Sequence, residues 1–449
     1  MSVEIVELSA TTRLVANKDN AMDRQKSLKT RRQILTAGLG LGASALALRA
    51  ANAQQSALDE LLNQRLADHQ SGWGDGFDST AQGQAPVISP EPMFSPASAV
   101  NLETALRQHS DMMNRGTWQP VPGNAVLRLG VRHANVQPLR ERLITMGDLA
   151  QQWGISDIFD SYVDSAVRRF QARHGLVVDG VMGAEGFAAM NVALGIRIRQ
   201  LETNLVRIRS MSGFLGDRYV MVNIPAASLE AINNGAVTTR HTAIVGKVDR
   251  PTPILDSRIH ELNFNPFWTV PVSIIRRDLI PLMQENPSYL AENNIRIFSG
   301  WSSSAQELSP TQVDWNTEEA TRYMFRQDPG EINSLGSVKI NFHNEHQVYL
   351  HDTPDKSLFG DDYRFLSSGC VRVQNVRELV TWLLNGTEGW SRQRIDQVIQ
   401  AGEPVNVEIP NPSPLYINYV TAWAASDGTV NFREDIYNRD GLPTIASNG

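Results

Sequence analysis

Short runs in which apolar and polar residues alternate constrain the fold of this 449-residue chain more than any other feature. Alternation of this kind is typical of β-strands with one buried face, and it is clearest at 338–342 and 405–409. Other β-rich runs lie at 219–224, 241–245, 347–350 and 415–423, and Asn234-Gly235 predicts a hairpin turn. These patterns predict a mostly antiparallel β domain over residues 218–440.

One helix inside this β-rich region is well marked. Its apolar residues share a face, and they are Val376, Leu379, Val380, Leu383 and Leu384. Asn375 stands at the N-cap position and Glu378 follows three residues later, a pattern that predicts a capping box.

Upstream of residue 218 the apolar residues follow helical spacing instead. Val163, Ala166, Val167 and Phe170 form one stripe, glycine turns follow it, and a further helical piece begins at Phe187. We expect a helix over 97–117, and we assign a helical scaffold segment to 101–121, a compact helical module to 122–192 and a helical connector to 193–217. Residues 54–100 have the composition of a linker, and 441–449 form a tail.

The first 53 residues have the features of an export signal. A basic region from Arg24 to Arg32 precedes an apolar stretch at 34–48, and a small-residue cleavage site ends at Ala53. Arg31-Arg32 resembles a twin-arginine signal, with Sec export as the alternative. A membrane anchor is disfavoured because the stretch is about 15 residues long and a bilayer needs roughly 20. We expect the mature protein in the periplasm.

Charge and cysteine content exclude several function classes. The first 53 residues carry eight basic and four acidic side chains, so cleavage after Ala53 changes the formal charge from −7 to −11. This acidity argues against a nucleic-acid-binding protein. A single cysteine excludes an intrachain disulfide and any multi-cysteine metal site, and no His-Glu-x-x-His motif is present. We therefore predict neither a metal nor another cofactor.

That cysteine lies in the segment Ser367-Ser368-Gly369-Cys370-Val371-Arg372, nineteen residues after His351. A thiol becomes a nucleophile beside a base or a positive charge, and His351 at a strand end could fold back to act as that base. The amides of Gly369 and Cys370 could converge on a developing oxyanion. Arg372 would share the face of the thiol in an extended segment.

Taken singly, each of these residues also has a structural explanation. A lone cysteine is commonly a small buried apolar residue, and Ser368 could bind near the scissile carbonyl or only shape the turn. We expect His343 and His346 to be structural or surface residues. Asp352 should point away from His351 along the strand, so we expect a backbone carbonyl, and not this carboxylate, to orient the imidazole.

Together, His351 and the Ser367–Arg372 segment resemble the signature of the L,D-transpeptidases with a YkuD catalytic domain. Further blocks resemble the large periplasmic YcbB-like branch of that family: 219–225, 245–247, 250–253, 264–271, 293–296, 326–330, 333–336 and Tyr437. The segment 166–183, with the opening turn at 127–130, resembles a three-helix peptidoglycan-binding domain. The implied fold class is multidomain α+β.

This resemblance implies a role for each motif residue. Cys370 would be the nucleophile and His351 its base, supported by Gly369, Ser368 and Arg372. Ser367 and Trp268 are further candidates for substrate contacts. The resemblance also implies a helical capping subdomain over about 265–336, because this segment is too long for a simple strand connection. We expect its aromatic residues to form its core: Trp268, Tyr289, Trp301 and Trp315.

The activity implied is the formation of 3→3 peptidoglycan cross-links. The thiol would attack a stem tetrapeptide at meso-diaminopimelate, release D-alanine and pass the acyl group from a thioester to a second diaminopimelate amine. Carbapenems would be inhibitors. Three alternatives stay open: an L,D-carboxypeptidase, a transferase that attaches an outer-membrane lipoprotein to peptidoglycan, and an inactive wall-binding scaffold. The helical module could also be a spacer that binds nothing, and the oligomeric state is not predicted.

Overall fold

The structure, a computed structural model, describes residues 90–441. The predicted export signal lies outside the described residues, as do most of the predicted linker and the tail beyond residue 441. Among the described helices, none is both long enough and apolar enough to span a bilayer. The end of the predicted linker needs correction, because Met93 and Phe94 are buried and helix α3 (Pro96–Asn114) begins before residue 100.

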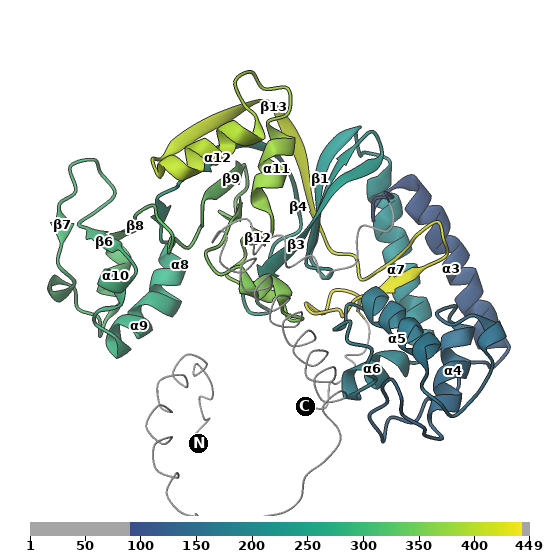
Figure 1. The fold of residues 1–449 in the computed structure, drawn as a ribbon. Coiled ribbons are helices and arrows are strands. Elements are labelled where there is room, and N and C mark those ends of the chain that lie inside the picture. The colour runs from purple at the N-terminus through teal and green to yellow at the C-terminus, as the bar shows by residue number, and fades with distance from the viewer. Residues whose placement is uncertain (1–89, 442–449) are drawn as a thin grey trace, which may run out of the picture. The chain divides into compact units, whose positions relative to one another are not determined.

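The β-rich region forms a sheet of nine strands in the order β11-β3-β12-β10-β9-β4-β13-β1-β2 (Figure 1). The strands are β1 (Arg218–Asn223), β2 (Ser228–Asn233), β3 (Ala236–Gly246), β4 (Leu255–Phe264), β9 (Val338–Phe342), β10 (Leu350–His351), β11 (Phe365–Ser367), β12 (Val371–Val373) and β13 (Val405–Asn418). Six strand pairs in it are antiparallel and three are parallel. The predicted α+β class with a mostly antiparallel β domain is therefore confirmed.

Strand β3 joins the two ends of this sheet. Its first part pairs with β2, whereas Ala243 and Ile244 pair with β12 and the last two residues pair with β11. The sheet therefore curls back on itself. The β2–β3 hairpin turns at Asn234 and Gly235, whose φ angles are 51° and 76°, as the Asn-Gly signal predicted.

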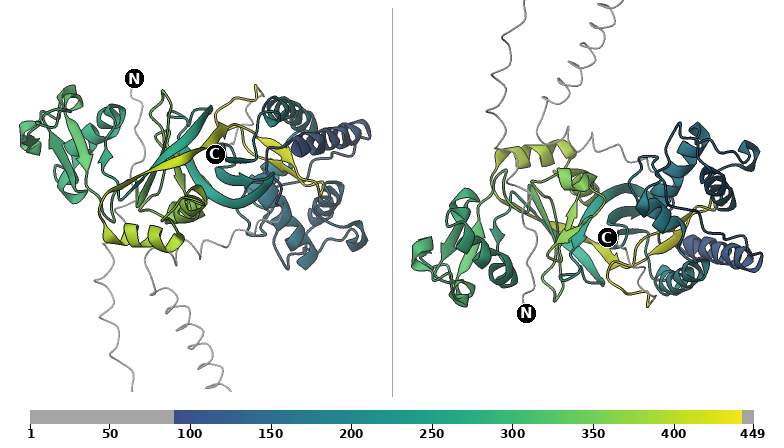
Figure 2. Two further views of the ribbon diagram at one scale, coloured as in Figure 1. Left: turned by 90° about the horizontal axis from the view of Figure 1, so that it is seen from above. Right: turned by 90° about the horizontal axis from the view of Figure 1, so that it is seen from below.

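Helices cover both faces of the sheet because alternate residues of its inner strands are buried on opposite sides (Figures 1 and 2). Val220 and Val222 of β1 belong to a core shared with the helices α11 and α12. Tyr219 and Met221 belong to a second core with α3 and α7. These helices are α7 (Leu194–Ser212), α11 (Val376–Leu383) and α12 (Arg392–Ala401).

The helical module has a separate core made by three helices. They are α4 (Val136–Thr145), α5 (Ser161–His174) and α6 (Ala184–Met190). The whole predicted stripe of α5 is fully buried. This helix begins where the Asp160 carboxylate accepts hydrogen bonds from the amides of Tyr162 and Val163, and it ends at Gly175 in the left-handed conformation with a φ of 70°.

The insertion at 265–336 also has its own core, and it is not purely helical as predicted. A four-stranded sheet accompanies its helices, and its strands are too short to show alternation in the sequence. Trp268, Tyr289 and Trp315 pack against this core, but Trp301 is 59% exposed, so its predicted core role is wrong. The elements are β5 (Trp268–Thr269), β6 (Ile295–Phe298), β7 (Glu307–Leu308), β8 (Met324–Gln327), α8 (Val272–Ile274), the π-helix η3 (Ile275–Leu279), α9 (Ile280–Glu285) and α10 (Tyr289–Glu292).

Local predictions at four places also need correction. Asn375 precedes α11 with a φ of 51°, and its side chain makes no capping bond. The run 347–350 is a strand only at its end, because Gln347 has a φ of 55°. The two runs after residue 405 share one strand, β13, which contains a register shift, and Phe187 lies inside α6. The remaining elements are β14 (Ala422–Ala424), β15 (Val430–Phe432) and the 3₁₀ turns Gln151–Trp153, Pro310–Gln312, Glu318–Arg322 and Ser357–Gly360.

Candidate active site

Cys370 and His351 lie on the same face of two neighbouring strands. Strands β10 and β12 run parallel, with Leu350 opposite Val371 and His351 opposite Arg372. Leu350 and Val371 are buried in the core beneath the sheet. Because side chains alternate along a strand, His351 and Arg372 project from the other face. Cys370, the residue before β12, is placed by the same alternation on the face of Arg372, and it also packs in part against the core. The thiol and the imidazole are therefore diagonal neighbours on this face.

Tyr349 lies directly opposite Cys370, and the sequence patterns did not reveal its importance. Its hydroxyl hydrogen-bonds with Cys370 and accepts a bond of 3.2 Å from the indole N–H of Trp268. Its ring meets His351 edge-on with centroids 5.6 Å apart, and the ammonium of Lys339 lies 4.5 Å from the ring centroid. Its place two residues before His351 is the signal that could have identified it, since strand alternation puts both on one face.

Burial keeps the side chains of Cys370 and His351 uncharged. It raises the pKa of the Cys370 thiol to about 11, although Tyr349 hydrogen bonds and the charges of Lys339 and Arg372 act in the opposite direction. Burial also lowers the pKa of His351 to about 3, and the positive charge of Arg372 adds to this effect. Near neutral pH the site therefore holds a thiol beside a neutral imidazole, and not a preformed ion pair.

The orientation of the His351 ring differs in part from our expectation. Its Nδ1 atom is buried and has no hydrogen-bond partner among the described residues, although the Asp352 backbone lies near enough to raise the pKa of the imidazole. The Asp352 carboxylate accepts from the amide and hydroxyl of Ser337 at 2.9 and 2.8 Å, and it pairs with Lys356. As strand alternation predicted, this carboxylate does not orient the ring.

Side-chain hydrogen bonds define the turn before Cys370. Ser367 Oγ accepts from the Gly369 amide at 3.2 Å and donates to the Cys370 carbonyl. Gly369 has a φ of 112°, which favours glycine, and its carbonyl accepts a bond of 2.9 Å from Thr252 Oγ1. The Gly369 amide is thus already engaged, which leaves the Cys370 amide as the candidate oxyanion donor.

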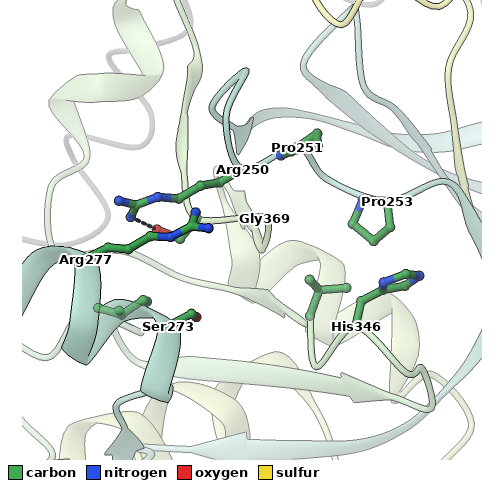
Figure 3. A pocket seen from close by; sticks show the side chains of 10 residues that line it. Arg250, Pro251, Pro253, Ser273, Arg277, His346 and Gly369 are labelled. Atoms are coloured by element: carbon green, nitrogen blue, oxygen red, sulfur yellow. Dashed lines mark hydrogen bonds between the residues drawn. The ribbon is translucent and has the colours of Figure 1, made fainter. Parts of the chain in front are cut away.

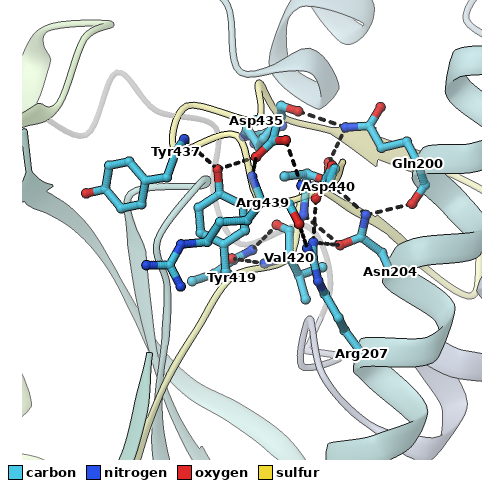
Figure 4. Close-up of polar contacts among 12 residues, drawn as sticks. Gln200, Asn204, Arg207, Tyr419, Val420, Asp435, Tyr437, Arg439 and Asp440 are labelled. Carbon is cyan, nitrogen blue, oxygen red and sulfur yellow. Dashed lines mark hydrogen bonds and ion pairs between the residues drawn. The ribbon is translucent and has the colours of Figure 1, made fainter. Parts of the chain in front are cut away.

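Thr252 connects this turn to a larger polar network, of which Figure 4 shows the part around Tyr437, Tyr419 and Asp435. Its hydroxyl accepts from the Gly246 amide at 2.8 Å. The hydroxyl of Tyr437 donates to the Gly246 carbonyl and accepts from the Thr252 amide at 3.3 Å. The Tyr437 amide in turn donates to the hydroxyl of Tyr419, which donates to Asp435 at 2.7 Å. Hydrogen bonds between segments that are far apart in the sequence therefore hold the turn in place.

Ser368 connects the turn to the insertion. Its Oγ accepts a bond of 3.0 Å from the Arg250 guanidinium, which also forms a two-pronged ion pair with Asp278 of η3, at 2.5 and 2.9 Å. In this structure Ser368 therefore contacts Arg250 and shapes the boundary between the catalytic sheet and the insertion. Arg250 and Asp278 are site residues that sequence reasoning did not identify.

A pocket of about 250 Å³ opens beside this turn, and Ser368 and Gly369 form part of its wall (Figure 3). His346 lines the pocket too, and it is exposed, in agreement with the expectation of a structural or surface residue. His343 is exposed and stacks on His260 with ring centroids 4.1 Å apart. Within residues 90–441, no group of three or more His, Cys, Asp or Glu side chains is placed to hold a metal ion.

Two family models match the chain. The L,D-transpeptidase catalytic domain, YkuD, matches residues 217–407. The family described as "Putative peptidoglycan binding domain" matches residues 132–190. The first match contains every motif residue from His351 to Arg372 and all strands of the sheet except most of β13, and the second contains helices α4, α5 and α6.

A curated relative from Haemophilus influenzae, named "Putative L,D-transpeptidase", is 33% identical over 243 residues. The match covers 54% of this chain and 48% of the relative, so the chain spans about half the length of that protein.

Solved L,D-transpeptidases are similar at low identity. One from Mycobacterium smegmatis is 13% identical and covers 45% of this chain and 58% of its own, with a TM-score of 0.23. One from Xylanimonas cellulosilytica is 16% identical, and the match covers 67% of this chain and 100% of that protein, with a TM-score of 0.21. LdtMt1 in complex with imipenem is 16% identical, and the match covers 45% of this chain and 59% of that protein, with a TM-score of 0.22. Residues 217–407 thus match the L,D-transpeptidase catalytic domain of the YkuD family, and residues 132–190, N-terminal to them, match the putative peptidoglycan-binding domain.

Proposed function

We propose that this protein forms 3→3 cross-links between the diaminopimelate residues of peptidoglycan stem peptides, with Cys370 as its nucleophile. The observation that carries this proposal is the placement of the half-buried thiol of Cys370 and the imidazole of His351 on one face of β10 and β12, inside a domain of the L,D-transpeptidase family.

The first half of the reaction would transfer the acyl group to the enzyme. Because the Cys370 thiol and His351 are both neutral at rest, the proton moves to the imidazole as sulfur attacks the carbonyl of the third stem residue. The tetrahedral oxyanion collapses to a thioester as the bond to D-alanine breaks. The imidazolium returns its proton to the departing D-alanine amine, so charge and protons balance.

The second half would resolve the thioester. The side-chain amine of another diaminopimelate attacks the thioester carbonyl, gives a proton to His351 and forms the new amide bond, while the thiol of Cys370 is restored. The Cys370 amide is the candidate donor to the oxyanion in both halves. The indole N–H of Trp268 donates to the Tyr349 hydroxyl, and this contact with the site supports Trp268 as a candidate for contacts with the stem peptide.

The rest of the chain supports a role at the cell wall. The peptidoglycan-binding domain would hold the enzyme on its polymeric substrate. The export signal proposed for residues 1–53, of the twin-arginine or Sec type and cleaved after Ala53, would deliver it to the periplasm. A lysine of an outer-membrane lipoprotein is a chemically equivalent amine acceptor, and water as acceptor would make the enzyme an L,D-carboxypeptidase.

Product analysis tests this proposal. Purified protein is incubated with tetrapeptide fragments that contain diaminopimelate, and the products are separated and weighed by mass spectrometry. We expect free D-alanine and 3→3 dimers, and no product with Cys370→Ala. Tripeptide without dimer would establish carboxypeptidase activity instead, and an absence of any product would favour a wall-binding scaffold.

A further inference from the structure

The pocket adjoins the turn that precedes Cys370, residues 367–369, which we call the nucleophile turn. Two arginine side chains form part of its lining. Arg250 and Arg277 both line it, and Figure 3 shows both side chains on one side of the pocket, with His346 on the other. No Asp or Glu is among the described residues that line it. Ser368 and Gly369, the residues just before Cys370, form part of the same pocket.

The two arginines differ in what neutralises them. Arg250 makes its two-pronged ion pair with Asp278 and also holds Ser368. The exposed side chain of Arg277, in contrast, forms no hydrogen bond or ion pair with any described residue. The charge of Arg277 is therefore available to an anion that enters the pocket, because a guanidinium binds a negative ligand through charge-assisted hydrogen bonds.

A π-helical turn directs Arg277 to this pocket. In η3 the Ile280 amide bonds to the Ile275 carbonyl, five residues back instead of four. Pro281 follows, and in a regular α-helix its ring would crowd the Arg277 carbonyl. The wider turn places Arg277 with Ser273 and Ile274 in the pocket wall. Such turns are frequent at functional sites.

We infer that Arg277, which shares the pocket wall with Arg250, binds a carboxylate of the stem peptide and so helps to select anionic stems. This inference rests on the proposed function, because it assigns part of the same substrate to a pocket that adjoins the nucleophile turn. Guanidinium groups bind carboxylates through two parallel hydrogen bonds, which a lysine cannot reproduce. The carboxylate could be that of glutamate, of diaminopimelate or of the terminal D-alanine.

Amidated substrates distinguish these sources. Tetrapeptides in which one carboxylate at a time is converted to its amide are compared as acyl donors with wild-type protein, Arg277→Ala and Arg277→Lys. Arg276→Ala is the matched control, since Arg276 is the adjacent residue, pairs with Glu318 at 3.1 Å and does not line the pocket. The rate of release of D-alanine, or of D-alaninamide from the donor amidated at its C-terminus, gives kcat and KM, and alkylation by uncharged iodoacetamide reports the state of Cys370.

We expect Arg277→Ala to lower kcat/KM by about 10-fold to 100-fold, chiefly through KM, with a partial recovery in Arg277→Lys. One amide substitution should lower the wild-type kcat/KM by a similar factor and change that of Arg277→Ala by less than about twofold. Alkylation of Cys370 and the activity of Arg276→Ala should match wild type.

The inference is overturned if Arg277→Ala and Arg276→Ala behave alike, or if every amidation lowers kcat/KM by the same factor in wild type and in Arg277→Ala. Failure of the proposed function gives a different result, because the wild-type protein would then release no D-alanine from the unmodified tetrapeptide. In that case the carboxylate assignment is lost with the activity on which it rests.

Discussion

Replacing Thr252 with valine should loosen the nucleophile turn without changing the volume of the side chain. Thr252 is fully buried, and its hydroxyl accepts from the Gly246 amide at 2.8 Å and donates to the Gly369 carbonyl at 2.9 Å. Valine has nearly the same shape but can make neither bond. Two buried backbone groups would therefore lose a partner in the substitution Thr252→Val.

The expected loss of unfolding free energy follows from those two hydrogen bonds. A buried polar group without a partner costs about 1–3 kcal/mol, so Thr252→Val should lower the free energy of unfolding by about 2–6 kcal/mol. The control Thr252→Ser keeps the hydroxyl and loses one methyl group, which should cost about 1 kcal/mol. Since the Gly369 carbonyl lies one residue before Cys370, a small shift of the turn should slow acylation by about 10-fold or more.

Denaturant unfolding and the rate of D-alanine release measure the two effects separately. We expect Thr252→Val to lose both stability and kcat under conditions where it is still folded, and Thr252→Ser to retain most of each. If Thr252→Val acylates as fast as wild type, the hydroxyl does not position the turn, and our account of the Thr252–Gly369 bond is wrong.

The remaining predictions concern charge and hydrogen bonding. Because burial lowers the pKa of His351 to about 3, the unfolded chain binds more protons than the folded chain between about pH 6.5 and pH 3. The free energy of unfolding should therefore fall as the pH is lowered through this window, which denaturant midpoints measure. The raised pKa of Cys370 predicts that iodoacetamide alkylation increases about tenfold per pH unit without a plateau near pH 7, and a plateau there would contradict it. Tyr349→Phe should raise that pKa further and slow alkylation at a fixed pH, whereas unchanged alkylation would show that the hydroxyl does not stabilise the thiolate. Asp148→Asn should leave the buried charge of Arg173 uncompensated and cost about 3–5 kcal/mol of unfolding free energy, and a loss below about 1 kcal/mol would mean that solvent reaches the pair.

The sequence predicted the parts of the fold that depend on local patterns. The alternation at 338–342 coincides with β9, because every second side chain there is buried. The stripe of α5 forms the core of the helical module, and Asn234-Gly235 adopts the positive φ angles that a two-residue hairpin needs. In each case the signal and the structure involve the same few residues.

Features that depend on long-range packing could not be read in this way. The strands of the insertion are two to four residues long, too short for a visible period. The expected cap at Asn375 did not form, because that residue adopts a left-handed conformation and its side chain does not bond to the helix amides. Strand β13 continues through a register shift that interrupts its alternation.

The residues of the candidate site also fall into two groups, those that the sequence predicted and those that it did not. Motif spacing brought Cys370 and His351 to notice, and the pairing of β10 with β12 explains why residues nineteen positions apart become neighbours. The partners of the turn come from distant segments. Thr252 is separated by 117 residues from Gly369, and Arg250 by 118 from Ser368, so no local pattern could connect them.

The proposed mechanism requires Cys370 to be the acylated nucleophile and His351 to be its base. Intact-mass spectrometry after exposure to a carbapenem tests it directly, because the strained lactam amide imitates the scissile bond. We predict one adduct per chain on the wild-type protein, none on Cys370→Ala, and much slower formation on His351→Ala. An adduct that persists at full occupancy on Cys370→Ala would show that another residue reacts, and would contradict the mechanism.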